Sequence, residues 1–251
     1  MLMTPCPDQN LKANSSLSGV VQRGSYGEIL RGTLADGASI DVTGILACFA
    51  SVLPEKFVEF DNKQRGDALN LELYGYDYSQ GVAIVQIRHA FRRYRNGYLN
   101  VHKDYVLVGQ NEETREFFRH PVSAHAVHAA IRKDDLDPIA PVRGAQRWMW
   151  SVTDKQLSQG IRQGDILIVP AKSRPPLAEP IDATSVMVGR THEIHASAFC
   201  RDKKGIVWAF APTVRHTKGQ HMKAYGDRDC WHSVRVGREA PTWEWGARLG
   251  D

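Results

Sequence analysis

GVAIVQIRHAFRRYRNGYLNVHKDYVLVG (residues 81–109) contains two runs rich in β-branched and aromatic residues, which meet at Asn96–Gly97. An Asn-Gly pair between two such runs is the strongest short-range signal for a β-hairpin, because the tight turn needs positive φ at both positions. We therefore predict a hairpin over 82–108 with a two-residue loop, in which Phe91 faces His102. The aliphatic residues at the base of both strands indicate that this end belongs to a core.

Toward the tip of this hairpin, arginines lie on both faces and alternate with aromatic residues. Because unpaired buried charge is costly, we expect this end to project into solvent or against a polyanion. A two-stranded ribbon fits the major groove of DNA, and an arginine–aromatic surface also suits single-stranded or structured RNA. The sequence therefore predicts a nucleic-acid-binding surface, with RNA favoured, made by Arg88, Arg92, Arg93, Tyr94, Arg95 and Tyr98. In the alternative, the arginines pair with carboxylates such as Glu112, Glu113 and Glu116.

Shorter patterns surround the hairpin. The segment 68–78 alternates leucine with polar residues, which is typical of a half-buried strand. The segment 25–45 predicts a second hairpin that turns at Asp36–Gly37. An alanine-rich stretch predicts one helix near 123–133, with Ser123 as its N-cap.

The second half of the chain returns to short β-type segments after a possible short helix at 154–161. The expected fold is α+β and predominantly β, with two β-rich halves built from small sheets or barrels, a projecting hairpin and one short helix. We expect a flexible lead over 1–19, a first domain over 20–150 and a second domain over 151–251 that carries a histidine cluster.

Bulk composition excludes several classes of protein. Hydrophobic residues make up 42% and charged residues 24% of the 251 residues, which is ordinary for a globular chain. No apolar run approaches the roughly 18–20 residues that span a bilayer, and the first residues do not resemble a signal peptide. The four cysteines form no CxxC pair, which favours a reducing, cytoplasmic setting. The net charge of +4 is compatible with a nucleic-acid partner.

The segment THEIHASAFC (191–200) contains two histidines three residues apart. On a regular strand, residues at this spacing point to opposite faces, because the side-chain period is two. We therefore expect His192 or His195, but not both, to contribute to one site.

The segment RHTKGQH (215–221) places two histidines on either side of TKGQ. If TKGQ is the loop of a hairpin, His216 and His221 face each other across it, with Cβ atoms about 4.5–5.5 Å apart. This pair is the stronger candidate for holding one ion. Farther along, Cys230 and His232 share a strand face, which we expect to be buried and inert.

Three interpretations of these histidines remain open. In the first, His216 and His221 bind a divalent metal such as zinc, together with His192, His195 or both. In the second, His192, His216 and His221 supply a general acid and base for phosphodiester cleavage without a metal, since imidazole titrates near neutral pH. In the third, the histidines are structural residues of the strands.

Four segments of roughly the last 90 residues resemble a loosely defined group of small uncharacterised bacterial and phage proteins: RQGDILIVP (162–170), GRTHEIHA (189–196), RHTKGQH and WHSVRVGREAP (231–241). The pattern of that group runs from a QGD-plus-strand opening through GHxH-like and HxxH-like elements to an RQREY-like end. This chain departs from it by HEIH in place of HxH, by a longer gap from His216 to His221 and by the lack of a final tyrosine. The resemblance implies that the histidines form a unit, and it implies no activity.

Two functions from different classes follow. The first is a cytoplasmic nucleic-acid-binding protein, RNA favoured, whose C-terminal histidines add His- or metal-dependent phosphodiester cleavage. The second is a non-catalytic interaction module or assembly subunit, in which the hairpin docks on an acidic protein surface and the histidines are structural.

Overall fold

A computed structural model describes residues 21–33, 39–54, 68–92, 99–111, 114–219 and 221–242. These residues form two compact units. Unit 1 comprises the chain up to Gln110, Phe117–Ala145 and the chain from Glu239 onward; unit 2 comprises Asn111–Glu116 and Gln146–Arg238. The main boundary between the units thus lies between Ala145 and Gln146, near the predicted one at 150/151. Two segments depart from the predicted division, because Asn111–Glu116 belongs to unit 2 and the chain from Glu239 onward belongs to unit 1. The expected flexible lead over 1–19 lies outside the described residues.

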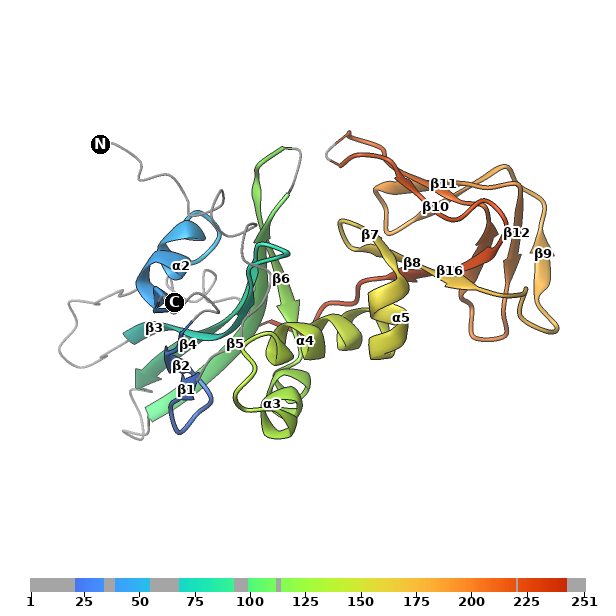
Figure 1. The fold of residues 1–251 in the computed structure, drawn as a ribbon. Helices are drawn as coiled ribbons and strands as arrows, with labels where there is room; N and C mark the ends of the chain where they lie inside the picture. Colours follow the sequence, from blue (N-terminus) through green and yellow to red (C-terminus); the bar gives the residue numbers. More distant parts are fainter. Residues whose placement is uncertain are drawn as a thin grey trace. The chain divides into compact units, whose positions relative to one another are not determined.

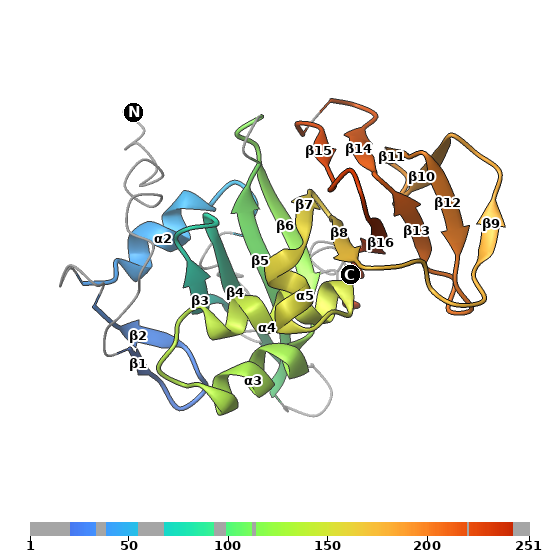
Figure 2. The same ribbon diagram turned by 45° about the vertical axis from the view of Figure 1, so that its right-hand side comes forward.

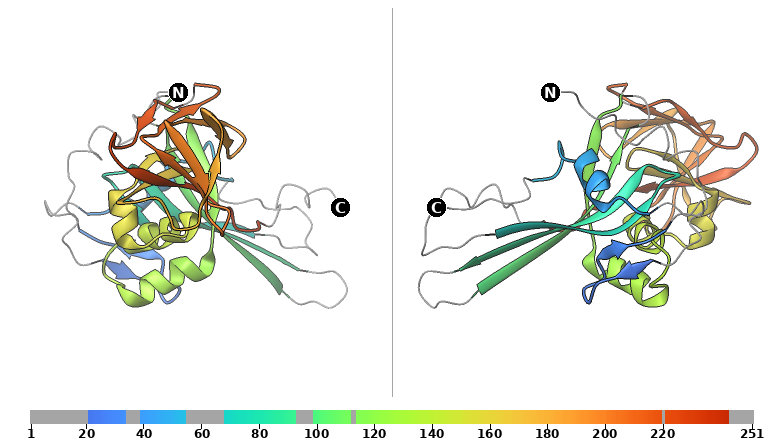
Figure 3. Two further views of the ribbon diagram at one scale, coloured as in Figure 1. Left: turned by 90° about the vertical axis from the view of Figure 1, so that its right-hand side faces the viewer. Right: turned by 60° about the vertical axis from the view of Figure 1, so that its left-hand side comes forward.

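Unit 1 is built on one antiparallel sheet of four strands in the order β3-β4-β5-β6, with helices on both sides (Figure 1). Its elements are β1 (Gln22–Arg23), β2 (Ile29–Arg31), α2 (Val42–Cys48), β3 (Ala68–Asp77), β4 (Val82–Arg92), β5 (Leu99–Gln110), β6 (Phe117–Val122), α3 (Ala124–Lys133) and the first part of α4 (Ala140–Trp150). The strand predicted over 68–78 is confirmed as β3. The hairpin predicted over 82–108 is confirmed as β4 and β5, which extend well beyond the helices of this unit (Figure 3).

The pairing within this hairpin differs from the predicted one. Phe91 faces Asn100 instead of His102, and Arg92 faces Leu99, so the register is shifted by two residues. A shift of two leaves every side chain on its face, and the alternation of residues therefore cannot distinguish the two registers. Contacts at the base of the hairpin distinguish the two registers. Gly109 lies opposite Val82, where a Cβ would come within 2.8 Å of the Val82 Cγ1 and 2.5 Å of a Phe118 ring atom.

The helix predicted near 123–133 is confirmed as α3, with the Ser123 hydroxyl accepting the N–H of Ala126. The short helix considered at 154–161 is also formed, as α5 (Asp154–Gln159). The described residues contain two further helices, α2 and α4, that the sequence did not predict. Helix α2 begins where the sequence predicted the second strand of a hairpin, since Asp41 caps it by accepting the N–H of Gly44. Thr33 and Ser39 still form an antiparallel bridge, while the predicted turn at Asp36–Gly37 lies outside the described residues. None of the described helices is long and apolar enough to cross a bilayer.

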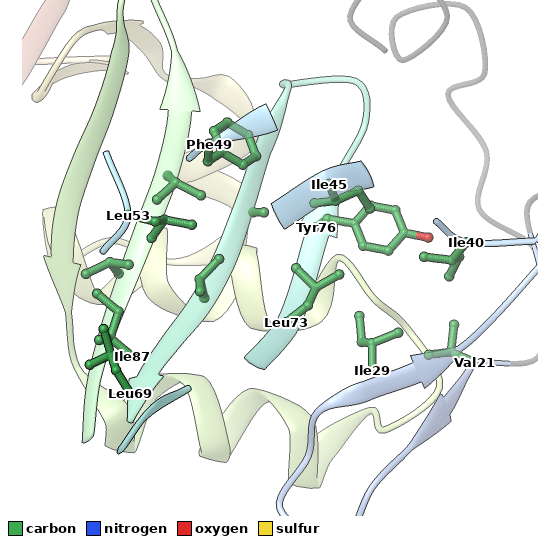
Figure 4. Close-up of a cluster of buried hydrophobic side chains, with 14 residues drawn as sticks. Val21, Ile29, Ile40, Ile45, Phe49, Leu53, Leu69, Leu73, Tyr76 and Ile87 are labelled. Carbon is green, nitrogen blue, oxygen red and sulfur yellow. The ribbon is translucent and has the colours of Figure 1, made fainter. Parts of the chain in front are cut away.

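The hydrophobic core of unit 1 lies between the sheet and the layer formed by β1, β2 and α2 (Figure 4). Ile45 from α2 and Phe49, the residue that caps its C-terminus, pack there against alternate residues of β3 and β4, such as Leu73 and Ile87. The opposite face of the sheet carries Tyr74, Gln86 and Tyr105, whose hydroxyl lies 2.7 Å from Nε2 of His128 on α3. This pairing accounts for His128 as a structural residue.

Gly75 on β3 lies close to the chain that leads into α4. A Cβ at this position would lie 2.7 Å from the Pro138 carbonyl oxygen and 2.9 Å from the Pro141 Cβ. The carbonyl is held in place because it accepts the N–H of Tyr76 (3.0 Å). Gly75→Ala is therefore expected to lower the free energy of unfolding by about 1–3 kcal/mol in urea titrations. Gly24→Ala is the control, since its Cβ would meet only the Glu28 side chain, and equal midpoints for the two variants would contradict the packing described.

Unit 2 consists of two antiparallel sheets that enclose a second core (Figure 2). The strand orders are β7-β8-β16-β13-β12-β9 and β10-β11-β14-β15. Its elements are the end of α4, α5 (Asp154–Gln159), β7 (Ile161–Gln163), β8 (Ile166–Ala171), β9 (Glu179–Ile181), β10 (Ser185–Val188), β11 (His192–His195), β12 (Ala198–Arg201), β13 (Val207–Phe210), β14 (Thr213–His216), β15 (Ala224–Tyr225) and β16 (Trp231–Val236). The predicted α+β, predominantly β class is therefore confirmed, with open sheets and no closed barrel among the described strands.

Candidate metal centre

Strands β11 and β14 place two histidines opposite each other. Their antiparallel register pairs His192 with His216, and the centroids of the two imidazole rings lie 4.8 Å apart. Because alternate residues of a strand share a face, His192 lies on the face of Ile194 and His216 on the face of Val214. Both Ile194 and Val214 belong to the core between the two sheets. The two histidines therefore extend that core at one edge, and both are buried.

The turn after β14 brings a third histidine to this pair. The His221 ring lies 5.1 Å from that of His216 and 6.0 Å from that of His192, centroid to centroid. The sequence predicted that His216 and His221 face each other directly across a hairpin loop, and this pairing is not formed. The ladder between β14 and β15 ends at Val214 and Ala224, so His221 reaches the cluster from outside the strand.

His192, His216 and His221 each offer one ring nitrogen to a common space, and these three atoms lie within 4.8 Å of one another. The Nε2 atom of His192 is fully buried and has no hydrogen-bond partner. Gly164 lies beside this space: a Cβ there would be 2.8 Å from Nε2 of His221 and 3.3 Å from Nε2 of His192. The two Nε2 atoms thus approach the same point, which is where the Cβ of any other residue at position 164 would lie. Because residue 164 is glycine, no side chain fills this point.

Three consecutive residues, Gln163 to Asp165, position the cluster. The Gln163 side chain donates to the carbonyl oxygens of Val214 and Met222, and so ties β14 to the segment that carries His221. Gly164 has φ of +58°, a conformation that glycine adopts without strain. An Asp165 carboxylate oxygen lies 3.3 Å from Nδ1 of His192. Carboxylates in this position orient metal-binding histidines and leave Nε2 free for the metal.

The second histidine has a different partner. The backbone N–H of Lys218 donates to Nδ1 of His216 (3.2 Å), which places the proton of neutral His216 on Nε2. Loading a metal therefore requires this proton to move to Nδ1 or the ring to rotate.

All three imidazoles have pKa values below the ordinary one. Burial, with additional repulsion from His216 and His221, lowers the pKa of His192 to about 4. Burial also lowers the pKa of His216, where the Asp165 carboxylate opposes this effect and Lys218 adds to it. Burial, His216 and Arg162 together lower the pKa of His221. The three side chains are consequently neutral at pH 7, which is the form that binds metals.

No family model, curated protein or solved structure matches the chain. What this site does must therefore be argued from its own geometry.

His195, which the sequence proposed as a possible ligand, lies outside the cluster. Its side chain is 48% exposed and its Nε2 lies 3.0 Å from a Glu193 carboxylate oxygen. The strand β11 is regular, so residues three apart point to opposite faces and His195 cannot share the space that His192 enters.

A second group, formed by Asp227, Cys230 and His232, also has ligand atoms within 4.8 Å of one another. Here both ring nitrogens of His232 have partners, because Nε2 accepts the N–H of Asp227 (3.1 Å) and Nδ1 lies 3.2 Å from the Cys230 carbonyl oxygen. Burial raises the pKa of the Cys230 thiol and disfavours the thiolate. The ring nitrogens of this group therefore already have partners, whereas the first cluster has a buried nitrogen without one.

Most residues of the predicted nucleic-acid-binding surface lie outside the part of the chain that the structure describes. Arg93, Tyr94, Arg95 and Tyr98 lie outside the described residues, and of Arg92 only the backbone is described. Arg88 is half-buried on β4, opposite Lys103 of β5.

The sequence predicted the three histidines but missed Gly164 and Asp165 as site residues. The available signal was the RQGDILIVP segment, whose Gln163, Gly164 and Asp165 now lie against the cluster.

Proposed function

We propose that unit 2 holds one divalent metal ion, zinc being preferred, on His192, His216 and His221, and that the metal activates water to cleave phosphodiester bonds in RNA. The observation that carries this proposal is the buried Nε2 of His192, which has no partner. A buried polar atom without a partner costs free energy. A metal ion in the space beside Gly164 would supply that partner.

The donor set favours zinc in a catalytic role. Neutral imidazoles suit Zn²⁺, and three protein ligands with one open position are typical of catalytic zinc sites, whereas structural sites have four. Among the described residues, this group contains three side chains and no fourth ligand. When bound, zinc lowers the pKa of a coordinated water to about 7, which provides hydroxide at neutral pH.

Positive charge around the cluster supports an anionic substrate. Arg162 and Lys218 are close enough to lower the pKa of His221 and His216, respectively. With a divalent metal between them, these side chains would attract a phosphodiester and offset the charge that develops on it. RNA as the bearer of that phosphodiester is supported by the arginine-rich hairpin of the sequence.

Metal content tests the first step. Protein purified without chelators is expected to retain about one zinc per chain by elemental analysis, as a single three-histidine site implies. After removal of zinc, Co²⁺ is expected to bind with the intense visible absorption of a four-coordinate ion. A folded protein that retains no metal, and takes up neither ion at about 100 μM, would exclude the centre.

Cleavage tests the second step. The zinc-loaded protein is expected to cleave a 5′-labelled single-stranded RNA, and chelation of the metal should abolish the reaction. His195→Ala, on the other face of β11, should cleave like the unmodified protein. Stoichiometric zinc without metal-dependent cleavage would refute the hydrolytic role and leave the metal structural.

A further inference from the structure

A cleft of about 860 Å³ opens elsewhere in unit 2. This volume lies within the range of about 300–1,000 Å³ that small-molecule sites occupy. It is lined by two indoles, three cationic side chains and one carboxylate: Trp150, Trp208, Lys203, Lys204, Arg235 and Asp202. The lining therefore combines aromatic surface with an excess of positive charge.

Asp202 fixes the geometry of one wall. One of its carboxylate oxygens accepts the N–H groups of Lys204 (2.9 Å) and Ile206 (3.0 Å), and the other accepts the indole N–H of Trp208 (3.1 Å). These contacts hold the turn between β12 and β13 and orient the Trp208 ring. The two exposed lysines, Lys203 and Lys204, extend from that turn. The Asp202 carboxylate therefore fixes the shape of this wall, and both of its oxygens already accept hydrogen bonds from the protein.

Arg235 supplies the third positive charge, and it lies on the same face of the sheet as Trp208. Strand pairing places Ser233 directly opposite Trp208, and Arg235 two residues farther along β16. Among the described residues, the guanidinium makes one hydrogen bond, from Nε to the Ser233 hydroxyl (3.3 Å). The Asp202 carboxylate attracts this guanidinium. Within the described part of the chain its terminal nitrogens make no hydrogen bond, and a half-buried arginine binds an anion more strongly than one in bulk water.

We infer that this cleft binds a nucleotide, with the base against the Trp208 indole and the phosphate between Arg235 and the two lysines. Bases stack on aromatic side chains whatever their sequence, and arginine and lysine are the usual partners of phosphate. A purely apolar ligand would leave three cationic groups unused, and inorganic phosphate would leave the indole unused. A free mononucleotide and one residue of an RNA strand share the required chemistry.

The cleft and the histidine cluster meet at Asp165. The Trp150 indole N–H, on the cleft side, donates to the Asp165 carbonyl oxygen (2.9 Å), while the Asp165 carboxylate approaches His192. Asp165 thus contacts both a residue of the cleft and a residue of the cluster. The inference itself does not depend on a metal, and it is tested on metal-free protein.

The test follows the indole N–H resonance of Trp208 by NMR in the presence of EDTA, with the resonance assigned by Trp208→Phe. The probes are AMP, adenosine, inorganic phosphate and a six-residue oligoadenylate. AMP is expected to shift the Trp208 resonance, with an affinity at least about tenfold higher than that of adenosine or phosphate. Equal affinity for AMP and the oligonucleotide would identify a mononucleotide site, and tighter binding of the oligonucleotide would identify a strand site.

Substitutions locate the binding. Lys203→Gln with Lys204→Gln, and separately Arg235→Gln, are expected to weaken AMP binding at least about fivefold. Lys155→Gln is the matched control, because this exposed residue of α5 lies outside the cleft. The two lysines are exposed, so their variant should fold even if the arginine variant does not. The inference is overturned if AMP leaves the Trp208 resonance unmoved, if phosphate binds as tightly as AMP, or if the lysine variant binds like the control.

Discussion

Replacing His192 with alanine is expected to lower the affinity for Zn²⁺ at least about 100-fold, a larger loss than is usual for removing an outer-shell partner. In the proposed site, His192 is the residue best prepared to bind a metal. Its Nδ1 is next to the Asp165 carboxylate, and its Nε2 is buried without a partner. Its removal leaves two histidines, one of which must first give up the contact with the Lys218 N–H.

Competition with a chromophoric chelator measures this loss. His195→Ala is the matched control, because it changes the same residue type on the same strand and should stay within about threefold of the unmodified affinity. Circular dichroism of both metal-free variants establishes that the sheets are intact. A wild-type affinity in folded His192→Ala would mean that zinc binds elsewhere, and a loss of equal size in His195→Ala would remove the case for this cluster.

Zinc should also stabilise unit 2 in proportion to its binding. An ion that binds only the folded state adds about 2.7 kcal/mol to the free energy of unfolding at a free concentration of 100 times Kd. His192→Ala should lose this increment in stability. That loss would show that the ion that stabilises the two sheets binds at His192.

Local patterns in the sequence were sufficient for parts of this site and not for others. The alternation of side chains along 192–195 correctly predicted that His192 and His195 lie on opposite faces, because that prediction needs only the geometry of one strand. The loop was predicted at 217–220, and its described part, 217–219, forms a turn. The strand partner of His216 was not predicted, since pairing depends on where the ladder ends. Asp165 and Gly164 reach the cluster only through the packing of the β7–β8 turn against a different sheet, and no local pattern encodes that.

The same distinction explains the errors in unit 1. The pairing of β4 with β5 confirms the hairpin, whereas the predicted turn at Asn96–Gly97 lies outside the described residues. The register follows from the close approach at Gly109 and Phe118, at the base of the hairpin. Helix α2 was missed because its seven residues are β-branched or small at several positions, and the decisive contact is the Asp41 cap. Helix α4 was not predicted. Its second residue is Pro141, and a proline in the first turn of a helix costs no hydrogen bond, so this helix begins where proline is tolerated.

Acid is expected to destabilise the metal-free protein between about pH 6.5 and pH 4. The pKa of His192 is about 4 in the folded protein and returns toward 6.5 on unfolding. The unfolded state therefore binds the extra proton in this window, and stability is complete above it and falls as the pH decreases. His216 and His221 act in the same direction, because burial lowers their pKa values as well.

Urea titrations in EDTA at several pH values measure the effect, which for each proton taken up is at most about 1.4 kcal/mol per pH unit. His192→Gln removes one of the titrating groups, so its free energy of unfolding should fall less steeply with acid than that of the unmodified protein. His195→Gln should keep the original slope, since that residue lies outside the cluster. Equal slopes for His192→Gln and the unmodified chain would show that His192 is not held neutral by its surroundings, and the argument for a buried ligand without a partner would fail with it.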